Sequence, residues 1–461
     1  MLQAINNNSD SITKDIQATD ARHHLHPFTD SGALNSAGAR VITGAEGVYL
    51  WDSEGHKLID GMAGLWCVNL GYGRQELIDA ATKQLNELAY YNTFFQTTHN
   101  PAASLAKEIA SITPGDLNHI FFASSGSEAI DTLIRMVRHY WQLKDKPYKK
   151  ILISRENAYH GSTIGGTSLG GMTGMHKQGG PLVPDIHRIR QPYWYGEGED
   201  QNEEEFGLSC AKALEDKILE VGPDNVAAFV GEPIQGAGGV IVPPKSYWTE
   251  IQRICRKYDI LLAADEVICG FGRTGNWFGC QTFGFQPDIM TMAKGLSSGY
   301  LPISAVAVGD QIANTLMESG SDFNHGFTYS GHPVAAAVAI ENIRILKEEK
   351  VIEYVAEDIG PYFQSRLRQV LGNHPLVGHI EGEGLVAGMA LVKDKASKTF
   401  FEDELDIGLI CRNFCFENGL IMRACGSRMV LSPPLIITRE EVDELIEKAL
   451  KCLNLTLESV S

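Results

Sequence analysis

The chain has 461 residues, of which 44% are hydrophobic and 21% charged, which indicates a globular protein of one large or two modest domains and excludes a disordered or fibrous one. Its formal net charge of -18 argues against nucleic acid or an anionic membrane as a partner, because either would require a basic surface. The nine cysteines include no CxxC pair, so they predict neither a disulfide framework nor a zinc site, and we expect no metal. Residues 1–20 are polar without a signal-peptide core, and no apolar run reaches membrane-spanning length, which predicts a cytoplasmic protein.

A β-hairpin is predicted near the N-terminus, where residues 47–52 and 57–60 form two strand-like runs around a turn at 53–56. Further along, from about residue 77 to 337, short apolar runs alternate with helical patterns, including a helix from Glu128. These runs are residues 120–123, 151–153, 226–230, 261–264 and 289–292. Such alternation predicts an α/β fold with a mostly parallel sheet and helices on both of its faces.

The pattern changes after a long helical stretch predicted for residues 333–370. Beyond it come an apolar run at 384–391, a helix at 407–417, strands near 420–423 and 429–431, and a last helix whose start has Thr438 and Glu441 in capping-box spacing. We therefore expect a smaller α+β domain, and divide the chain into residues 1–69 (an N-terminal segment and part of the small domain), 70–335 (the large domain) and 336–461 (the C-terminal small domain). The acidic run at 196–205 is expected to be a solvated loop.

One lysine and one acid stand at the ends of two predicted strands. Lys294 follows the apolar run 289–292, and Asp265 follows the run 261–264. A lysine in an apolar pocket has its charged form disfavoured, so its amine is free to form a Schiff base with an aldehyde. An aspartate beside a pyridine nitrogen keeps that nitrogen protonated and makes the ring an electron sink. Taken alone, Lys294 is more simply a structural or solvated lysine, but the pair indicates pyridoxal phosphate.

A phosphate site is predicted where Ser125, Gly126 and Ser127 follow the strand 120–123 and open the next helix. Such a turn offers free backbone N–H groups, hydroxyls and the positive end of the helix dipole to an anion. The alternative is a serine-rich N-cap without a ligand. A GxGxxG pattern at 270–275 is rejected as a dinucleotide fingerprint, because no helix is predicted to begin at its last glycines. Those glycines are expected to shape a loop.

Six stretches together resemble the class III, fold-type I aminotransferases, and the likeness extends over almost the whole chain. They are residues 60–69, 135–141, 159–161, 232–239, 265–275 and 323–333. The chain is most similar to the omega-transaminases, including putrescine and other diamine:pyruvate aminotransferases. The resemblance implies a pyridoxal phosphate enzyme whose large domain has a mostly parallel, seven-stranded type of sheet flanked by helices, with a smaller α+β domain built from both termini. It also implies a homodimer with shared active sites, with a tetramer left open.

The resemblance assigns cofactor-binding roles to particular residues. Lys294 becomes the Schiff-base lysine and general acid/base, Asp265 the partner of the pyridine nitrogen, and residues 125–127 part of the phosphate cup. Tyr159 is expected to stack on the ring, although it would also suit a core. Val267, expected two residues further along an extended strand end, would pack on the opposite face.

Three more residues complete the expected cofactor site. His160 follows Tyr159 and is counted with it. Glu232 resembles an acid near the active site. Thr328 is expected to reach the phosphate of the neighbouring subunit.

A substrate pocket is implied by five further residues. Arg423 lies where the family places an arginine that pairs with the acceptor carboxylate and swings out for apolar amines; the alternative is a structural ion pair at a strand end. Trp66, Phe94 and Phe28 resemble the aromatic residues that bound the family's pocket, although each would equally suit a core. Ala237 resembles a small residue that sets pocket size.

The activity implied by the resemblance is transfer of an amino group from a primary amine or a putrescine- or cadaverine-like diamine to pyruvate, with ping-pong kinetics. An ω-amino acid such as β-alanine remains an alternative donor, and 2-oxoglutarate as acceptor would need a second cationic contact that the sequence does not identify. Decarboxylases and aminomutases share the lysine, aspartate and phosphate motifs, but the amine-pocket sequence disfavours them. A non-enzymatic regulator is disfavoured because no appended DNA-binding segment or partner-binding repeat is found.

Overall fold

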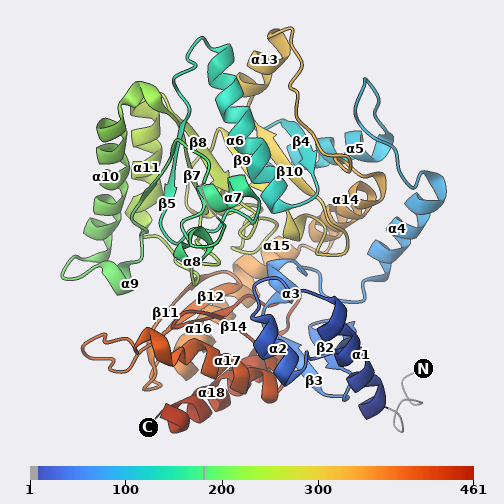
Figure 1. Cartoon of the computed structure of the whole chain (residues 1–461), viewed down its shortest axis with the longest axis vertical. Coiled ribbons are helices and arrows are strands. Elements are labelled where there is room, and N and C mark those ends of the chain that lie inside the picture. The colour runs from blue at the N-terminus through green and yellow to red at the C-terminus, as the bar shows by residue number, and fades with distance from the viewer. Residues whose placement is uncertain (1–8, 180–181, 461) are drawn as a thin grey trace.

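A seven-stranded sheet forms the centre of the larger part of the molecule (Figure 1), in a computed structural model that describes residues 9–179 and 182–460. Its strands, in spatial order, are β4 (His119–Ala123), β10 (Ser304–Val308), β9 (Ile289–Met292), β8 (Leu261–Asp265), β7 (Val226–Gly231), β5 (Ile151–Arg155) and β6 (Ile186–Ile189). Only β10 runs antiparallel to its neighbours β4 and β9, so the predicted mostly parallel sheet is confirmed.

Helices cover both faces of this sheet. The helices of the first 300 residues, both those on this sheet and those elsewhere in the molecule, are α1 (Ser9–His23), α2 (Ser31–Ala37), α3 (Ala63–Trp66), α4 (Gln75–Glu87), α5 (Asn100–Ala110), α6 (Gly126–Leu143), α7 (Ile164–Leu169), α8 (Thr173–His176), α9 (Trp194–Glu197), α10 (Glu203–Val221), η1 (Pro223–Asn225), α11 (Lys245–Lys257), α12 (Gly279–Thr282) and η2 (Lys294–Leu296). The later ones are α13 (Asp310–Glu318), α14 (Pro333–Glu348), α15 (Val351–Tyr354), η3 (Val355–Ile359), α16 (Gly360–Leu371), η4 (Asp403–Leu405), α17 (Ile407–Glu417) and α18 (Arg439–Val460).

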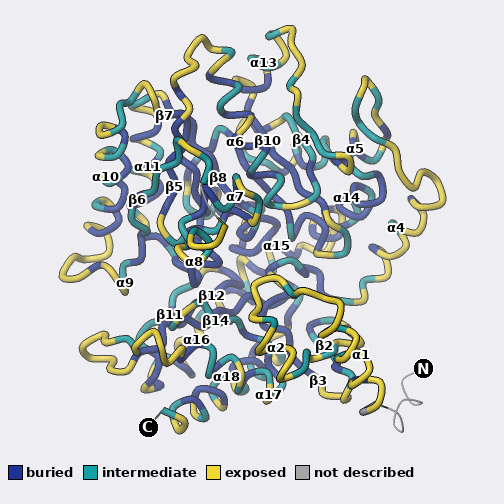
Figure 2. The backbone as a smooth tube through the Cα atoms, in the orientation of Figure 1, coloured by how far each residue is buried: buried dark blue, intermediate teal, exposed yellow. Residues whose placement is uncertain are grey.

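The core lies on the two faces of the sheet, and alternate residues of one strand serve different faces. In β8, Leu261 and Ala263 belong to the cluster formed with α6, whereas Leu262 and Ala264 belong to the cluster formed with α10, α11 and α14. All four side chains are buried, and the strands at the centre of Figure 2 are correspondingly dark. Burial on both faces explains why the strands appear in the sequence as continuous apolar runs.

Two four-stranded sheets lie below the large one in Figure 1 and contain residues from both ends of the chain. One comprises β1 (Ile42–Glu46), β2 (Tyr49–Asp52), β3 (Lys57–Asp60) and β13 (Leu420–Ile421), and the other β11 (Val377–Glu383), β12 (Val386–Leu391), β15 (Arg428–Leu431) and β14 (Arg423–Cys425). The predicted hairpin is confirmed as β2 and β3, and β13 adds to β3 in parallel.

Some predicted elements differ from the structure. The strands β6 and β10 were not predicted. The acidic run 196–205 is only partly a loop, because α10 begins at Glu203, where the Asn202 side chain accepts the backbone N–H of Glu205 at 3.0 Å. Acids in this first turn are favoured by the helix dipole.

The stretch predicted as one helix over 333–370 is broken. Lys350, between α14 and α15, adopts a left-handed backbone with φ 53°, and η3 is a π-helical segment. The predicted capping box at the last helix is confirmed, since Thr438 N–H donates to Glu441 Oε2 at 2.9 Å and Glu441 N–H to Thr438 Oγ1 at 3.2 Å.

The GxGxxG stretch forms turns rather than the start of a helix, with Gly272 at φ 96° and Gly275 at φ 85°. The expected loop is therefore confirmed. Within residues 9–179 and 182–460, none of the helices is both apolar enough and long enough to cross a bilayer. The polar stretch 1–20 forms α1 from Ser9 onward, and its first eight residues lie outside the described part of the chain.

Candidate active site

The candidate site lies at the carboxyl edge of the large sheet, where parallel strands characteristically present ligand-binding residues. Three neighbouring strands each place one charged residue there: Glu232 follows β7, Asp265 ends β8, and Lys294 follows β9. The ends of β4 and β5 add the turn at 125–127 and the loop that carries Tyr159 and His160. The sheet order therefore brings together residues that are far apart in the sequence.

A cavity of about 560 Å³ opens at this edge, within the usual size range of small-molecule sites. Its walls carry twelve of the fifteen residues predicted for the site: Phe28, Trp66, Gly126, Ser127, Tyr159, His160, Glu232, Ala237, Asp265, Val267, Lys294 and Arg423. Most of them were predicted through the resemblance rather than from local pattern, yet all twelve line the same cavity.

Asp265 is buried and held by three hydrogen bonds. Its Oδ2 lies 2.7 Å from Nδ1 of His160, and its Oδ1 accepts bonds from Thr291 Oγ1 at 3.1 Å and from the backbone N–H of Val267 at 3.2 Å. Nε2 of His160 is also buried and has no hydrogen-bond partner in the described part of the chain. These bonds fix the carboxylate in one orientation at the cavity wall.

Lys294 begins the short η2 segment directly after β9, with a left-handed backbone at φ 46°. Burial is the largest influence on its amine and lowers its pKa, while the charge of Asp265 acts in the opposite direction. Its Nζ lies 5.8 Å from the centre of the Trp66 ring. A lysine with a lowered pKa supplies a neutral amine at a lower pH than an exposed lysine does.

The turn at residues 125–127 forms the capped N-terminus of α6. Ser125 is the N-cap, its Oγ accepting the N–H of Glu128 at 3.2 Å, and Ser127 Oγ accepts the N–H of Ser162 at 3.0 Å. Close packing leaves no room for a side chain at Gly161, where φ is 119° and a Cβ would lie 2.5 Å from Ser127 Oγ. Gly126 and Ser127 line the cavity, whereas Ser125 caps the helix without lining the cavity.

Val267 and Glu232 lie beside the Asp265 carboxylate, and the sequence predicted only part of their local structure. Val267 was expected on an extended strand end, but β8 stops at Asp265 and a turn begins at Val267, because its N–H bonds back to the aspartate. It still lines the cavity. Glu232 is buried, with Oε1 accepting the N–H of Tyr159 at 3.2 Å and Oε2 that of Gly236 at 2.9 Å, and burial raises its pKa. Glu232 thus holds the loop that carries Tyr159.

The outer part of the cavity is aromatic and cationic. The Arg423 guanidinium lies over the buried Trp66 ring, with Cζ 4.7 Å from its centre. Phe28 is 73% exposed, and its ring meets that of Tyr159 edge-on at 6.2 Å. Phe28 therefore stands at the mouth of the cavity rather than in a core.

Phe94 and Thr328 do not line this cavity. Phe94 lies beside Gly326 in a separate hollow of about 350 Å³, and the backbone oxygen of Thr328 accepts a bond from Tyr90 Oη at 2.7 Å. Their roles remain predictions.

Arg412 on α17 lines the cavity but was not predicted. It is half-buried, and its Nε has no hydrogen-bond partner in the described part of the chain. The available sequence signal was an arginine in a helix next to the Arg423 strand, but only the packing of α17 against β13 and β14 shows which way that helix faces.

The residues present fit pyridoxal phosphate. The cofactor brings an anionic phosphate, a ring nitrogen and an aldehyde. The cavity offers a helix N-terminus, a fixed carboxylate and a buried amine for these three groups, in that order. The arrangement defines a fold-type I pyridoxal phosphate enzyme.

Comparisons with known proteins agree. The family described as Aminotransferase class-III matches residues 33–453. The chain is 59% identical over 448 residues to the putrescine--pyruvate aminotransferase of Pseudomonas aeruginosa, covering 97% of this chain and 98% of that one. It is 42% identical to a gamma aminobutyrate transaminase 3 of Solanum lycopersicum, covering 96% and 87%. An (S)-enantioselective omega-transaminase from Thermomicrobium roseum matches with a TM-score of 0.94 and 44% identity, covering 96% of this chain and 99% of that one.

The chain belongs to the class III aminotransferases. Its cofactor is pyridoxal phosphate, as the sequence predicted.

Proposed function

We propose that the enzyme is an omega-transaminase that moves an amino group from a primary amine or diamine, with putrescine as the favoured donor, to pyruvate. The observation that carries this proposal is that Lys294, Asp265 and Arg423 line one cavity. The 59% identity to a putrescine--pyruvate aminotransferase, over nearly the full length of both chains, supports the choice of substrates. The two substrates would react in turn at the same site, with ping-pong kinetics.

Each residue has a proposed part in the reaction. Bound pyridoxal phosphate supplies an aldehyde that condenses with amines and a ring that accepts electrons. Asp265 would hold the proton of the ring nitrogen, oriented by His160. Nζ of Lys294 would take the proton from the carbon bearing the donor's amino group and deliver it to the former aldehyde carbon of the cofactor. Residues 125–127 would bind the phosphate, while Tyr159 and Val267 would cover the two ring faces, with Glu232 holding the Tyr159 loop.

Arg423 would give the cavity its dual specificity. A diamine has no carboxylate, whereas pyruvate has one, so a fixed cation would oppose one of the two substrates. The guanidinium can form two parallel hydrogen bonds to the carboxylate of pyruvate. When an amine without a carboxylate binds, the guanidinium can remain over the Trp66 ring. Ala237 would leave room for the donor chain, and Phe28 would contact it at the mouth.

An ω-amino acid such as β-alanine is the second candidate donor. Arg412 favours it, because a second guanidinium on the cavity wall could bind a carboxylate distant from the reacting amine. The same contact would serve the second carboxylate of 2-oxoglutarate. The similarity to a gamma aminobutyrate transaminase supports this alternative.

The assembly is proposed to be a homodimer, with association of dimers into a tetramer left open. Phe94 and Thr328 lie outside the cavity of their own chain, and both would contribute to the site of the partner subunit, Thr328 at the phosphate. The division at residues 69/70 and 335/336 is kept as a proposal, supported by the pairing of β13 with β3. A cytoplasmic location also remains a prediction.

Product analysis tests the proposed substrates. The holoenzyme is incubated with pyruvate and either putrescine or β-alanine, and alanine formation is measured. Faster alanine formation from putrescine supports the diamine proposal. If alanine forms with β-alanine but not with putrescine, β-alanine is the donor instead. If alanine forms with neither amine, the proposed function is rejected.

A further inference from the structure

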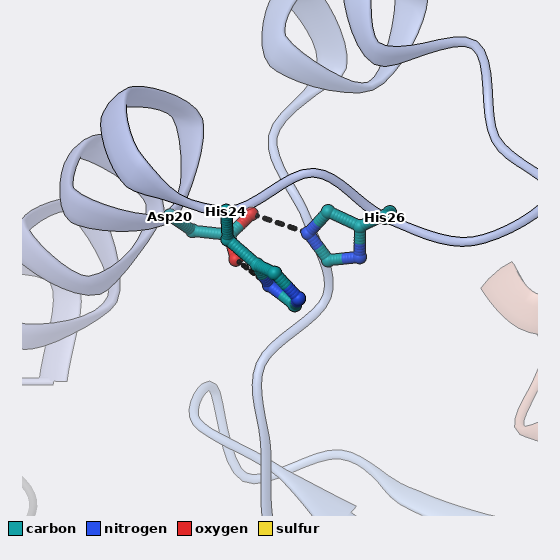
Figure 3. A group of neighbouring side chains, drawn as sticks. All are labelled: Asp20, His24 and His26. Carbon is teal, nitrogen blue, oxygen red and sulfur yellow. Dashed lines mark hydrogen bonds and ion pairs between the residues drawn. The ribbon is translucent and has the colours of Figure 1, made fainter.

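A cluster of two histidines and one aspartate lies outside the active-site cavity, at the end of α1 (Figure 3). Asp20 is in the last part of the helix, and the backbone N–H of His24 still bonds to the Asp20 carbonyl at 2.9 Å. Nδ1 of His24 lies 2.9 Å from Asp20 Oδ1. Beyond the helix the chain turns back, so that Nε2 of His26 lies 2.8 Å from Asp20 Oδ2. Both imidazoles thus point at one carboxylate.

These three side chains offer the ligand set of a divalent transition metal. Each supplies one ligand atom, and the three atoms lie within 4.8 Å of one another. Two imidazole nitrogens and one carboxylate oxygen suit Zn²⁺ and its neighbours in the first transition row. Ligand atoms about 2.0 Å from a tetrahedral ion are about 3.3 Å apart. The two nitrogens lie 2.9 and 2.8 Å from different oxygens of Asp20, so these distances must widen by a few tenths of an ångström and the carboxylate must turn to bring one oxygen to the ion.

The surroundings allow an ion to enter. The side chains of His24, His26 and Asp20 are 59%, 25% and 19% exposed, so the cluster is open to solvent on the His24 side and a water can complete the coordination. Without an ion, each imidazole must carry a proton toward Asp20 to make its hydrogen bond. A metal ion takes the place of those two protons.

We propose that Asp20, His24 and His26 form a binding site for one divalent transition-metal cation of the zinc class. His26 is followed directly by Pro27 and Phe28, which both line the mouth of the cavity, and Phe28 has a left-handed backbone with φ 49°. An ion bound by His26 together with Asp20 and His24 would connect residues 26–28 to the end of α1. The site is structural: it fixes the segment that carries Phe28 against Tyr159 and takes no part in the chemistry.

A second group of carboxylates and one histidine provides a contrast. Asp52, Glu54 and His56 meet in the turn between β2 and β3. There the Asp52 Oδ1 already accepts the N–H groups of Glu54 and His56 at 3.0 and 2.9 Å, and only one imidazole is present. This group stabilises the turn and provides a control for nonspecific binding.

Equilibrium dialysis of the holoenzyme against Zn²⁺, followed by measurement of zinc per chain, tests the site. His24→Gln and Asp20→Asn are compared with two controls, His23→Gln at the exposed end of α1 and His56→Gln in the turn. The wild type and both controls should bind one Zn²⁺ per chain more than His24→Gln and Asp20→Asn. Because the His24 side chain is mostly exposed, His24→Gln should fold normally. Equal zinc content in the wild type and His24→Gln would overturn the proposal.

Hydrogen exchange tests the structural role separately from activity. With Zn²⁺, the backbone amides of residues 20–26 and 28 in the wild-type holoenzyme should exchange at least about tenfold more slowly, as expected for about 1.4 kcal/mol or more of added local stability. In His24→Gln, Zn²⁺ should not change their exchange. Unchanged exchange in the wild type despite bound zinc would overturn the role assigned to the ion.

Discussion

The guanidinium of Arg423 lies over the indole ring of Trp66, with Cζ 4.7 Å from the ring centre. The same ring lies 5.8 Å from Nζ of Lys294, so one aromatic side chain contacts both the cation proposed to bind the acceptor and the amine proposed to move the proton. The Arg423 side chain therefore has a stabilised position on the cavity wall when no carboxylate is present.

Replacing Arg423 separates the two half-reactions. In Arg423→Ala the pyruvate half-reaction should slow by about ten- to a hundredfold, because a charge-assisted hydrogen-bonded pair contributes about 1.5–3 kcal/mol. The amine half-reaction should change far less. Single-turnover kinetics of each half-reaction measure this. Arg423→Lys keeps the charge without the planar fork and should give an intermediate rate. Equal slowing of both half-reactions would show that Arg423 does not distinguish the acceptor from the amine.

Replacing Lys294 should stop turnover. Lys294→Ala removes the proposed proton carrier, and general acid/base catalysis contributes about 10²–10⁴-fold to a rate. Alanine formation from putrescine and pyruvate measures the loss. Near-normal turnover in this variant would show that the assignment of Lys294 is wrong.

The amine half-reaction should also depend on pH through Lys294. Burial lowers the pKa of its amine, so the neutral form persists to lower pH than in an exposed lysine. The rate should fall as pH decreases through that lowered pKa, since protonated Nζ cannot accept a proton. A pH–rate profile of the half-reaction tests this, and a rate that rises on acidification would contradict the role.

Asp265 should affect both the rate and that profile. In Asp265→Asn the ring nitrogen loses its anionic partner, and we expect the amine half-reaction to slow by about a hundredfold or more, as for other preorganised electrostatic contacts. The charge of Asp265 opposes the lowering of the Lys294 pKa, so its loss should move the acid limb of the profile to still lower pH. A slower variant with an unshifted limb would mean that the two groups are not coupled.

Gly161 should be required for the phosphate turn. An alanine at position 161 would have to adopt a φ of 119°, and its Cβ would lie 2.5 Å from Ser127 Oγ. Backbone strain of this kind costs about 1–3 kcal/mol, so the affinity of Gly161→Ala for pyridoxal phosphate should fall by about tenfold or more. Gly174→Ala is the control, because it has open space around the added methyl and an ordinary φ. Equal cofactor affinity of the two variants would contradict the assigned turn.

The sequence predicted the central elements of the site because their signals are local. The strands β8 and β9 are continuous apolar runs, and the carboxyl ends of neighbouring parallel strands meet at one edge, which places Asp265 near Lys294. β10 was missed because three of its five residues are serine or alanine, which favour strands less than the β-branched and aromatic residues do.

Other features depend on packing between distant segments. The side on which α17 faces, and hence the position of Arg412, follows from β13 and β14 packing against it. Likewise, the meeting of Asp20, His24 and His26 requires the chain to turn back after α1, which no local pattern indicates. The turn at Val267 arises because Asp265 bonds to its N–H and ends the strand.

The central claim is tested most directly by the absorbance of the purified enzyme with pyridoxal phosphate. Putrescine is added without an acceptor, and pyruvate is added afterwards. The yellow absorbance of the bound cofactor should disappear with putrescine and return with pyruvate. Unchanged absorbance on addition of putrescine, in an enzyme that responds to β-alanine, would contradict the proposed donor, and no response to any amine would contradict the transaminase mechanism itself.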